Sequence, residues 1–147
     1  MADIETFQKL LVVRERDKNL AKKNYQQSVQ FFENLASELY QLLKNKEDAE
    51  KEYQQQLANT SSVTMLSHYS LYIQRIKTKI GELQSSVNQA RQEMNDKQQQ
   101  LTEAHIEVKK FEKIIEKKRQ TATFKQKHEE NKFMDEITVT QFINSKR

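Results

Sequence analysis

Apolar residues recur three and four positions apart along the first part of the chain, from about Ile4 to Leu57. On a seven-residue repeat, the a and d positions of this segment are Phe7, Leu11, Arg14, Lys18, Ala21, Tyr25, Ser28, Phe32, Leu35, Leu39, Leu42, Lys46, Ala49, Tyr53 and Gln56. The stripe is mostly apolar and is cleanest between Ala21 and Leu42. It predicts a long helix that presents one face to a partner helix.

The same repeat is stronger in the second segment, which starts near Met65. Its a positions form an unbroken apolar row of Ile73, Ile80, Val87, Met94, Leu101, Val108 and Ile115. Its d positions are Ile76, Leu83, Ala90, Lys97, Ala104, Phe111 and Lys118. A seven-residue repeat of this length predicts a left-handed supercoil with another helix.

Between the two segments lies the only cluster of short polar residues, within residues 58–63. Such side chains bond to their own backbone and compete with helix, and Ser61 or Ser62 is a suitable N-cap for a second helix. The cluster therefore predicts a turn at about 59–63. One continuous helix with a polar patch is the alternative.

A turn at this place makes the chain an all-α, antiparallel two-helix coiled-coil hairpin. Residues then face each other when their numbers add up to about 122–126, so that Leu39 meets Val87 and Leu11 meets Phe111 to Ile115. We expect one domain over residues 1–147, with helices at about 4–58 and from 64 to 120 or beyond. Thr121-Ala122-Thr123 weakens the helical pattern, so residues 121–147 are expected to form a helical or mobile tail.

Composition limits the chemistry. Apolar residues make up 35%, below the 45–50% of a typical globular domain, and there are no cysteines and a single glycine. Disulfides, thiolate zinc sites, Walker A loops and Rossmann fingerprints are thereby excluded. No apolar run is long enough to span a membrane, and the N-terminus does not resemble a secretory signal. We expect a cytoplasmic protein without cofactors.

Several apolar residues lie outside the predicted seam and are candidates for partner binding. They are Phe31, Tyr40, Leu43, Tyr72, Ile106 and Ile114. For Phe31 and Ile114, burial at the edge of the seam is the favoured interpretation, whereas both interpretations stay open for Tyr40 and Tyr72.

Basic residues gather between Lys109 and Lys127, where eight basic and two acidic residues give a net charge of +6. Such a segment attracts nucleic acid, anionic lipid or an acidic protein surface, or it complements the negative end of a helix. Nucleic acid is disfavoured because the chain has no arginine-rich arm and no aromatic stacking platform.

His68, His105 and His128 have no histidine or carboxylate three or four positions onward, and a thin rod offers no pocket, so catalysis is not expected.

Four motifs in order resemble the FliJ family of flagellar export proteins. They are Phe7-Gln8-Lys9-Leu10-Leu11 with Arg14-Glu15, Tyr69-x-x-Tyr72-Ile73-x-x-Ile76, Leu101-Thr102-Glu103 with Glu107 to Lys113, and Met134-Asp135-Glu136. The resemblance implies a soluble, non-enzymatic component that inserts into the hexameric flagellar export ATPase, as the γ subunit does in rotary ATPases, and promotes its assembly and activity. It also implies contact with the cytoplasmic linker of the export-gate membrane protein and with export chaperones. Membrane association is then peripheral, through these partners, at the flagellar base.

The resemblance also implies two sets of binding residues. Those for the gate partner lie near the turn at Tyr53, Tyr72, Ile76, Lys79 and Leu83, with Ala49 beside them. Those for the ATPase lie near the termini at Phe7, Leu10, Leu11, Arg14, Phe111 and Ile115. The alternatives from the residues alone are a structural coiled coil that dimerises, and a basic protein that binds nucleic acid or a membrane surface.

Overall fold

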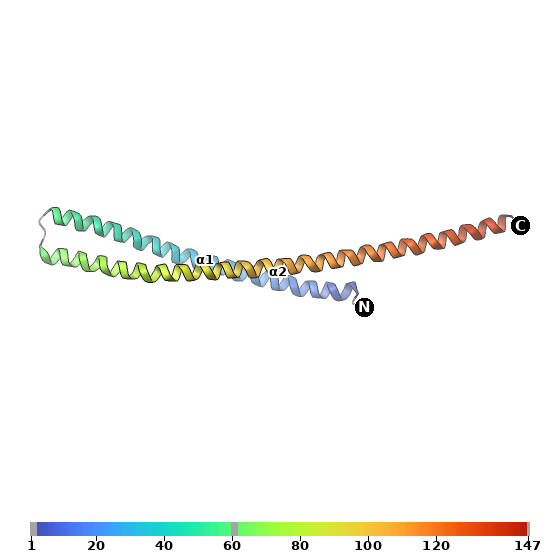
Figure 1. Cartoon of the computed structure of the whole chain (residues 1–147), viewed down its shortest axis with the longest axis horizontal. Coiled ribbons are helices and arrows are strands. Elements are labelled where there is room, and N and C mark those ends of the chain that lie inside the picture. Colours follow the sequence, from blue (N-terminus) through green and yellow to red (C-terminus); the bar gives the residue numbers. More distant parts are fainter. Residues whose placement is uncertain (1–2, 60–61, 147) are drawn as a thin grey trace. The chain divides into compact units, whose positions relative to one another are not determined.

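The computed structural model describes residues 3–59 and 62–146, which form two long helices (Figure 1). Helix α1 spans Ile4–Ala58 and helix α2 spans Val63–Ser145. They pack against each other as a hairpin, and no strand occurs among the described residues. The predicted all-α coiled-coil hairpin is confirmed.

Each helix begins at a side-chain cap. The Asp3 carboxylate accepts a hydrogen bond from the Thr6 backbone N–H at 3.1 Å, and the Ser62 hydroxyl accepts one from the Met65 N–H at 3.3 Å. Each oxygen satisfies a backbone donor that has no partner inside its helix. Ser62 is therefore the cap of α2, as one of the two predicted alternatives; Ser61 and Thr60 lie outside the described residues.

The seam follows the predicted repeat. Every a and d position from Phe7 to Gln56 and from Ile73 to Lys118 is buried or half-buried. Within residues 3–59 and 62–146, the apolar residues that are fully buried are Ala49, Ile73, Ile76, Ile80, Val87, Ala90, Val108 and Ile115. Seven of these eight belong to α2. This imbalance follows from the sequence, because polar residues interrupt the stripe of α1 but not the a positions of α2.

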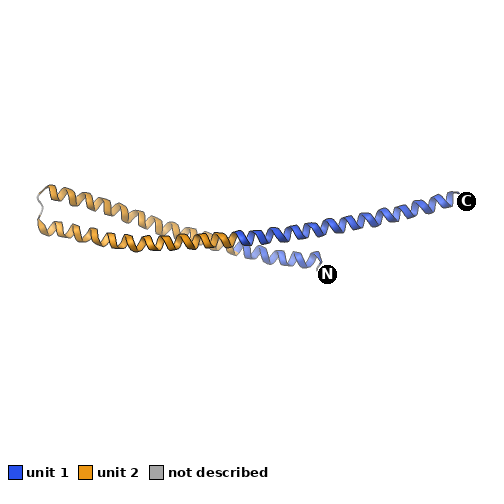
Figure 2. Ribbon diagram, in the orientation of Figure 1, with its two compact units in different colours: residues 1–19, 102–147 blue, residues 20–101 orange. Residues whose placement is uncertain are grey.

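The chain divides into two compact units (Figure 2). Unit 1 contains Met1–Asn19 and Thr102–Arg147, and unit 2 contains Leu20–Leu101. In unit 2 the Arg91 guanidinium lies over the Phe32 ring at 5.6 Å. In unit 1 the Arg14 guanidinium lies over the Phe111 ring at 5.8 Å. Both pairs agree with the antiparallel register expected from the sequence.

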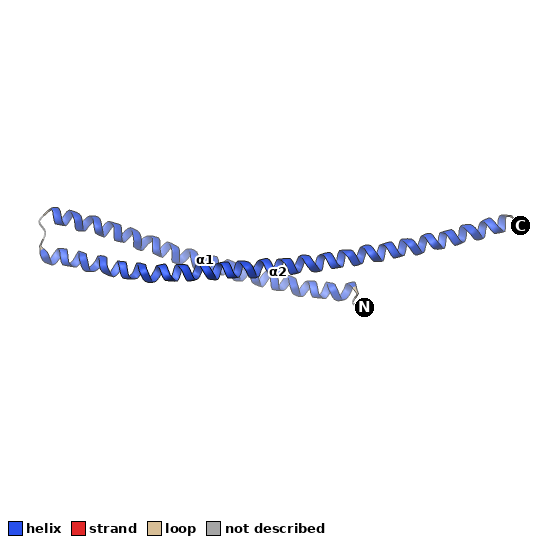
Figure 3. Ribbon diagram, viewed as in Figure 1, coloured by secondary structure: helices blue, strands red, loops and turns tan. Residues whose placement is uncertain are grey.

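Helix α2 continues without a break through the three residues that were expected to weaken it, and the tail is helical to Ser145 (Figure 3). The Thr121 hydroxyl donates to the Lys117 carbonyl at 2.9 Å, and Thr138 and Thr140 do the same to residues four positions earlier. Threonine satisfies its hydroxyl inside a helix in this way. A threonine pair is therefore a weaker stop signal than glycine or proline.

Phe31 is exposed, contrary to the expectation that the edge of the seam buries it. It borders a hollow of about 320 Å³ whose other lining residues are polar: Asn24, Gln27, Ser28, Glu93 and Lys97. Its seam neighbours in this hollow, Ser28 and Lys97, are polar and leave the Phe31 ring exposed. Ile114 is half-buried, as expected, whereas Tyr40, Leu43, Tyr72 and Ile106 are exposed.

Candidate protein-binding surfaces

An exposed aromatic surface lies at the start of α2, in unit 2. We call it the tyrosine patch and define it by Met65, His68, Tyr69 and Tyr72. With Ser62 and Thr64, these residues line an open groove of about 480 Å³. Tyr69 occupies a seam position and is half-buried, while Tyr72 is 48% exposed. The patch thus combines one anchored tyrosine with one that a partner can reach.

A second groove of about 240 Å³ joins the tyrosine patch to α1. Tyr69 and Tyr72 line it from α2, opposite Asn45, Asp48, Ala49 and Glu52 from α1. The small side chain of Ala49 leaves room above it, and the two carboxylates make the far rim acidic. A partner segment that inserts here would meet aromatic rings on one wall and negative charge on the other.

The residues expected at the gate-partner surface fall into different environments. Tyr72 and Lys79 are exposed, and Tyr53 and Leu83 are half-buried at seam positions. Ile76 is only 4% exposed and is part of the hairpin core. A partner that binds the closed hairpin therefore reaches Tyr72 and Lys79 but not Ile76. The sequence analysis did not select Met65 or His68 for this surface, although Met65 lies four residues before Tyr69 and His68 lies four residues before Tyr72, which was a usable signal.

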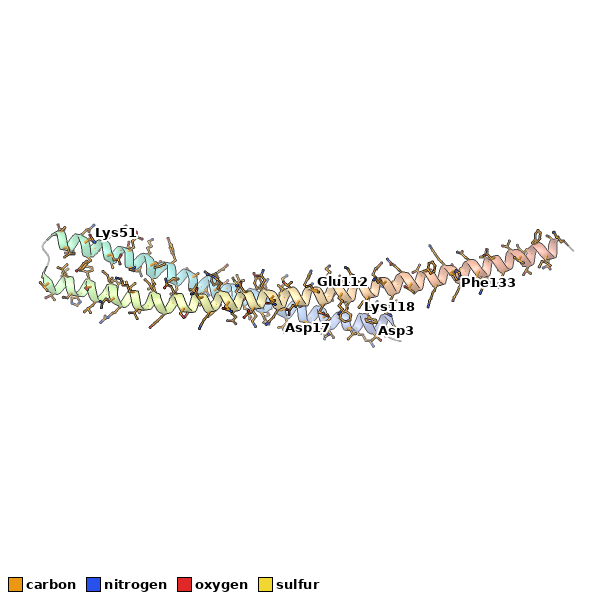
Figure 4. The ribbon with its side chains drawn as sticks, in the orientation of Figure 1. Asp3, Asp17, Lys51, Glu112, Lys118 and Phe133 are labelled. Carbon is orange, nitrogen blue, oxygen red and sulfur yellow. The ribbon has the colours of Figure 1, made fainter. Side chains whose placement is uncertain are left out.

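A cluster of aromatic and basic side chains lies in unit 1. The rings of Phe7 and Phe111 are tilted, with centroids 6.2 Å apart. Lys118, labelled in Figure 4, reaches from α2 toward the first turns of α1, and its Nζ lies 5.1 Å from the centroid of the Phe7 ring. Arg14 covers Phe111 from the other helix. Each cation is thus held against an aromatic face, which is a favourable electrostatic contact.

Arg14 also links the cluster to the surface of α1. Its Nη1 lies 3.3 Å from the Asp17 carboxylate, whereas its Nε is buried without a hydrogen-bond partner among the described residues. The contact with the Phe111 ring is then the main compensation for burying that part of the guanidinium. Arg14 is a structural member of the seam as well as a candidate binding residue.

The residues expected at the ATPase surface lie together in unit 1. Phe7, Leu11, Arg14 and Phe111 are half-buried, Ile115 is buried and Leu10 is 39% exposed. Val12 and Val13, which sequence reasoning did not select, are exposed on the same turns of α1 as Leu10. Leu10, Leu11, Val12 and Val13 are consecutive, and four consecutive residues of a helix cannot all face the seam. This run was the sequence signal that Val12 and Val13 are exposed.

The start of α1 has a pH-dependent cap. The hydrogen bonds that Asp3 accepts from the backbone N–H and hydroxyl of Thr6 lower the pKa of its carboxyl below the ordinary value of 3.8. Because the folded pKa is lower than the unfolded one, the cap stabilises the helix above the unfolded pKa, and this is lost as the pH falls through the folded value. We expect hydrogen exchange at the Thr6 amide to show additional opening as the pH falls below the ordinary carboxyl value of 3.8.

The matched control for this prediction is Asp3→Asn, which keeps a capping oxygen that does not titrate over this range. Its Thr6 amide should show the intrinsic pH dependence of exchange and no additional opening. An identical extra opening in Asp3→Asn and in the unchanged chain would assign the effect to another group.

Both surfaces are built from aromatic, aliphatic and charged side chains on open helix faces. Among the described residues, no group of three or more histidines and carboxylates is placed to hold a metal ion. None of the described helices contains a stretch apolar and long enough to cross a membrane. The fold and these surfaces therefore define a coiled-coil hairpin whose accessible features are suited to binding proteins.

Comparisons with known proteins identify the family. The family model described as "Flagellar FliJ protein" matches residues 3–147. The Flagellar FliJ protein of Bacillus subtilis (strain 168) is 40% identical over 137 residues, which are 93% of this chain and 93% of that protein. No solved structure matches the chain. The chain belongs to the FliJ family and is a flagellar protein related to export.

Proposed function

We propose that this chain is a non-enzymatic connector in the flagellar export apparatus. Unit 1 binds the hexameric export ATPase as a central coiled coil and promotes its assembly and activity. The tyrosine patch binds the cytoplasmic linker of the export-gate membrane protein, and export chaperones are further partners. The chain then resides in the cytoplasm at the flagellar base, held near the membrane by its partners.

The observation that carries the proposal is the presence of a separate accessible surface in each of the two units. Unit 1 exposes Leu10, Val12 and Val13 beside its aromatic and basic cluster. Unit 2 exposes the tyrosine patch beside an acidic rim. Exposed aromatic and aliphatic side chains at helical spacing favour docking on other proteins. Membership of the FliJ family supports the export apparatus as the place of these partners.

The rate of ATP hydrolysis by the purified export ATPase, titrated with this chain, tests the ATPase part of the proposal. We expect the unchanged chain to stimulate ATP hydrolysis. For the Leu10→Glu variant, half-maximal stimulation should require a concentration about ten times higher. Leu10 is accessible and lies outside the seam, so a carboxylate there removes an apolar contact without disturbing the hairpin. Substitutions of Leu11 or Phe111 are less informative because both side chains pack in the seam.

Leu43→Glu is the matched control. Leu43 is 42% exposed, against 39% for Leu10, and lies in unit 2. The Leu43→Glu variant should stimulate ATP hydrolysis at the same concentration as the unchanged chain does. A folded, helical chain that leaves the ATPase rate unaltered would contradict the proposed stimulation, and equal loss in both variants would contradict its assignment to unit 1.

A further inference from the structure

A basic stripe runs along the outward face of α2 in unit 1. We call it the lysine stripe and define it by Lys109, Lys110, Lys113 and Lys117. The seam of this segment is formed by Val108, Phe111 and Ile115, and all four lysines are exposed. Since they are spaced by three and four residues, they lie on one side of the helix, away from α1.

The stripe contains more than charge. Ile106 lies on the same helix face one turn before it, and Phe124 lies about two turns after it. They are 58% and 72% exposed. An isoleucine and a phenylalanine at the two ends of a lysine row are typical of a surface that meets both apolar and acidic groups.

The acidic residues within this segment do not neutralise the stripe. Glu112 pairs with Lys109 at 3.5 Å, and Glu116 accepts a hydrogen bond from the Gln120 amide at 3.3 Å. Lys110, Lys113 and Lys117 form no ion pair with any described residue. Three of the four lysines are thus available to a partner's carboxylates.

The other helix of unit 1 has a related outward face. Val12 and Val13 are exposed on α1, on the side away from Leu11 and Arg14 in the seam. Lys9, which pairs with Glu5 at 3.9 Å, and Arg16 lie on the same side, one turn before and one turn after them. Unit 1 thus presents apolar and basic side chains on both of its outward faces.

Two opposite faces with the same chemistry favour a partner that surrounds the unit over one that meets it from one side. A bilayer is planar and would contact a single face, which leaves the other face unexplained. Nucleic acid is bound mainly through its phosphates, which do not pair with exposed aliphatic side chains. A protein channel lined by carboxylates and apolar groups satisfies both faces at once.

We infer that the lysine stripe binds acidic side chains that line the central channel of the ring proposed above as the partner of unit 1. This inference rests on the proposed function, because it describes the chemistry of the same contact. Exposed charge pairs contribute mainly to the rate of association and to its dependence on salt. The stripe therefore guides unit 1 into the ring, and the flanking apolar side chains strengthen the final contact.

The test compares the full-length chain with two variants of equal charge change. The stripe variant carries glutamine at the four positions of the lysine stripe. The control variant carries glutamine in place of four exposed lysines of unit 2: Lys22, Lys23, Lys44 and Lys77. Binding of each labelled chain to the purified ATPase hexamer is measured by fluorescence anisotropy over a series of salt concentrations. Circular dichroism establishes that the three chains are equally helical.

We expect the stripe variant to bind the hexamer about tenfold more weakly than the unchanged chain at low salt, as the sum of several exposed ion pairs. Its affinity should also depend less on salt, because fewer screened charge contacts remain. The control variant should match the unchanged chain in both respects.

Three outcomes would overturn the inference, and they can be told apart. If the unchanged chain does not bind the hexamer, the proposed function fails and the inference with it. If the unchanged chain binds the hexamer and both variants bind as tightly as it does, only the lysine stripe is wrongly assigned. If the stripe variant keeps its affinity for the hexamer but loses binding to vesicles that contain phosphatidylserine, the stripe recognises a membrane surface.

Discussion

Replacing Val108 with aspartate is expected to unfold the paired part of unit 1. Val108 is 2% exposed and is the most deeply buried large side chain among the described residues. The substitution removes buried apolar surface and buries a charged carboxylate in the seam. We expect a loss of about 4 kcal/mol of unfolding free energy, combining the apolar and the charge contributions. Thermal unfolding followed by circular dichroism measures it.

The control for this prediction is only two residues away. Ile106 is 58% exposed on the opposite side of α2, so Ile106→Asp introduces the same charge without entering the seam. We expect it to change the unfolding free energy by less than about 0.5 kcal/mol. Equal effects of the two aspartates would contradict the assignment of Val108 to the seam and of Ile106 to the surface.

Tyr72→Ala is expected to weaken binding of the export-gate linker at least about thirtyfold, which corresponds to about 2 kcal/mol. Tyr72 is the accessible ring of the tyrosine patch and lines both grooves near the turn. Its loss removes the accessible one of the two rings that the grooves share, while Tyr69 stays anchored in the seam. Titration calorimetry of the purified linker with the full chain measures the change.

Tyr40→Ala is the appropriate control, because it makes the same chemical change in the same unit. Tyr40 is 69% exposed and is not part of either groove. Its removal should leave the affinity for the linker unaltered. Equal affinities for Tyr72→Ala and the unchanged chain would show that the patch is not the binding surface. Ile76 is unsuitable for this test, because its substitution also weakens the hairpin core.

The seam could be predicted in detail because its information is local. An apolar residue every three and four positions identifies the face of a helix that turns away from water, and the polar cluster at 58–63 identifies where the chain reverses. The a and d positions derived in this way are all shielded in the structure. Even polar residues at a and d positions, such as Arg14 and Lys18, lie in the seam, because the apolar residues around them in the repeat determine the orientation of the helix.

The sites were less predictable because accessibility depends on what lies across the seam. Phe31 was expected to be covered and is exposed, since its neighbours from α2 are Glu93 and Lys97. Ile76 belongs to a motif that indicates a binding surface, yet it is buried. Neither outcome can be derived from one helix alone, because the same repeat position is covered or open according to the size and polarity of the opposing residues.

The sequence by itself determined the two helices, the position of the turn, the antiparallel register and the family. All four depend on residue types at regular spacing, which one chain displays without reference to its fold. Only the tertiary structure decided which off-seam residues remain in water, how Arg14 and Lys118 cover the rings of Phe111 and Phe7, and how two grooves share Tyr72. The physical reason is that burial and cation–aromatic contact are properties of pairs of surfaces, and the second surface exists only when the helices have packed.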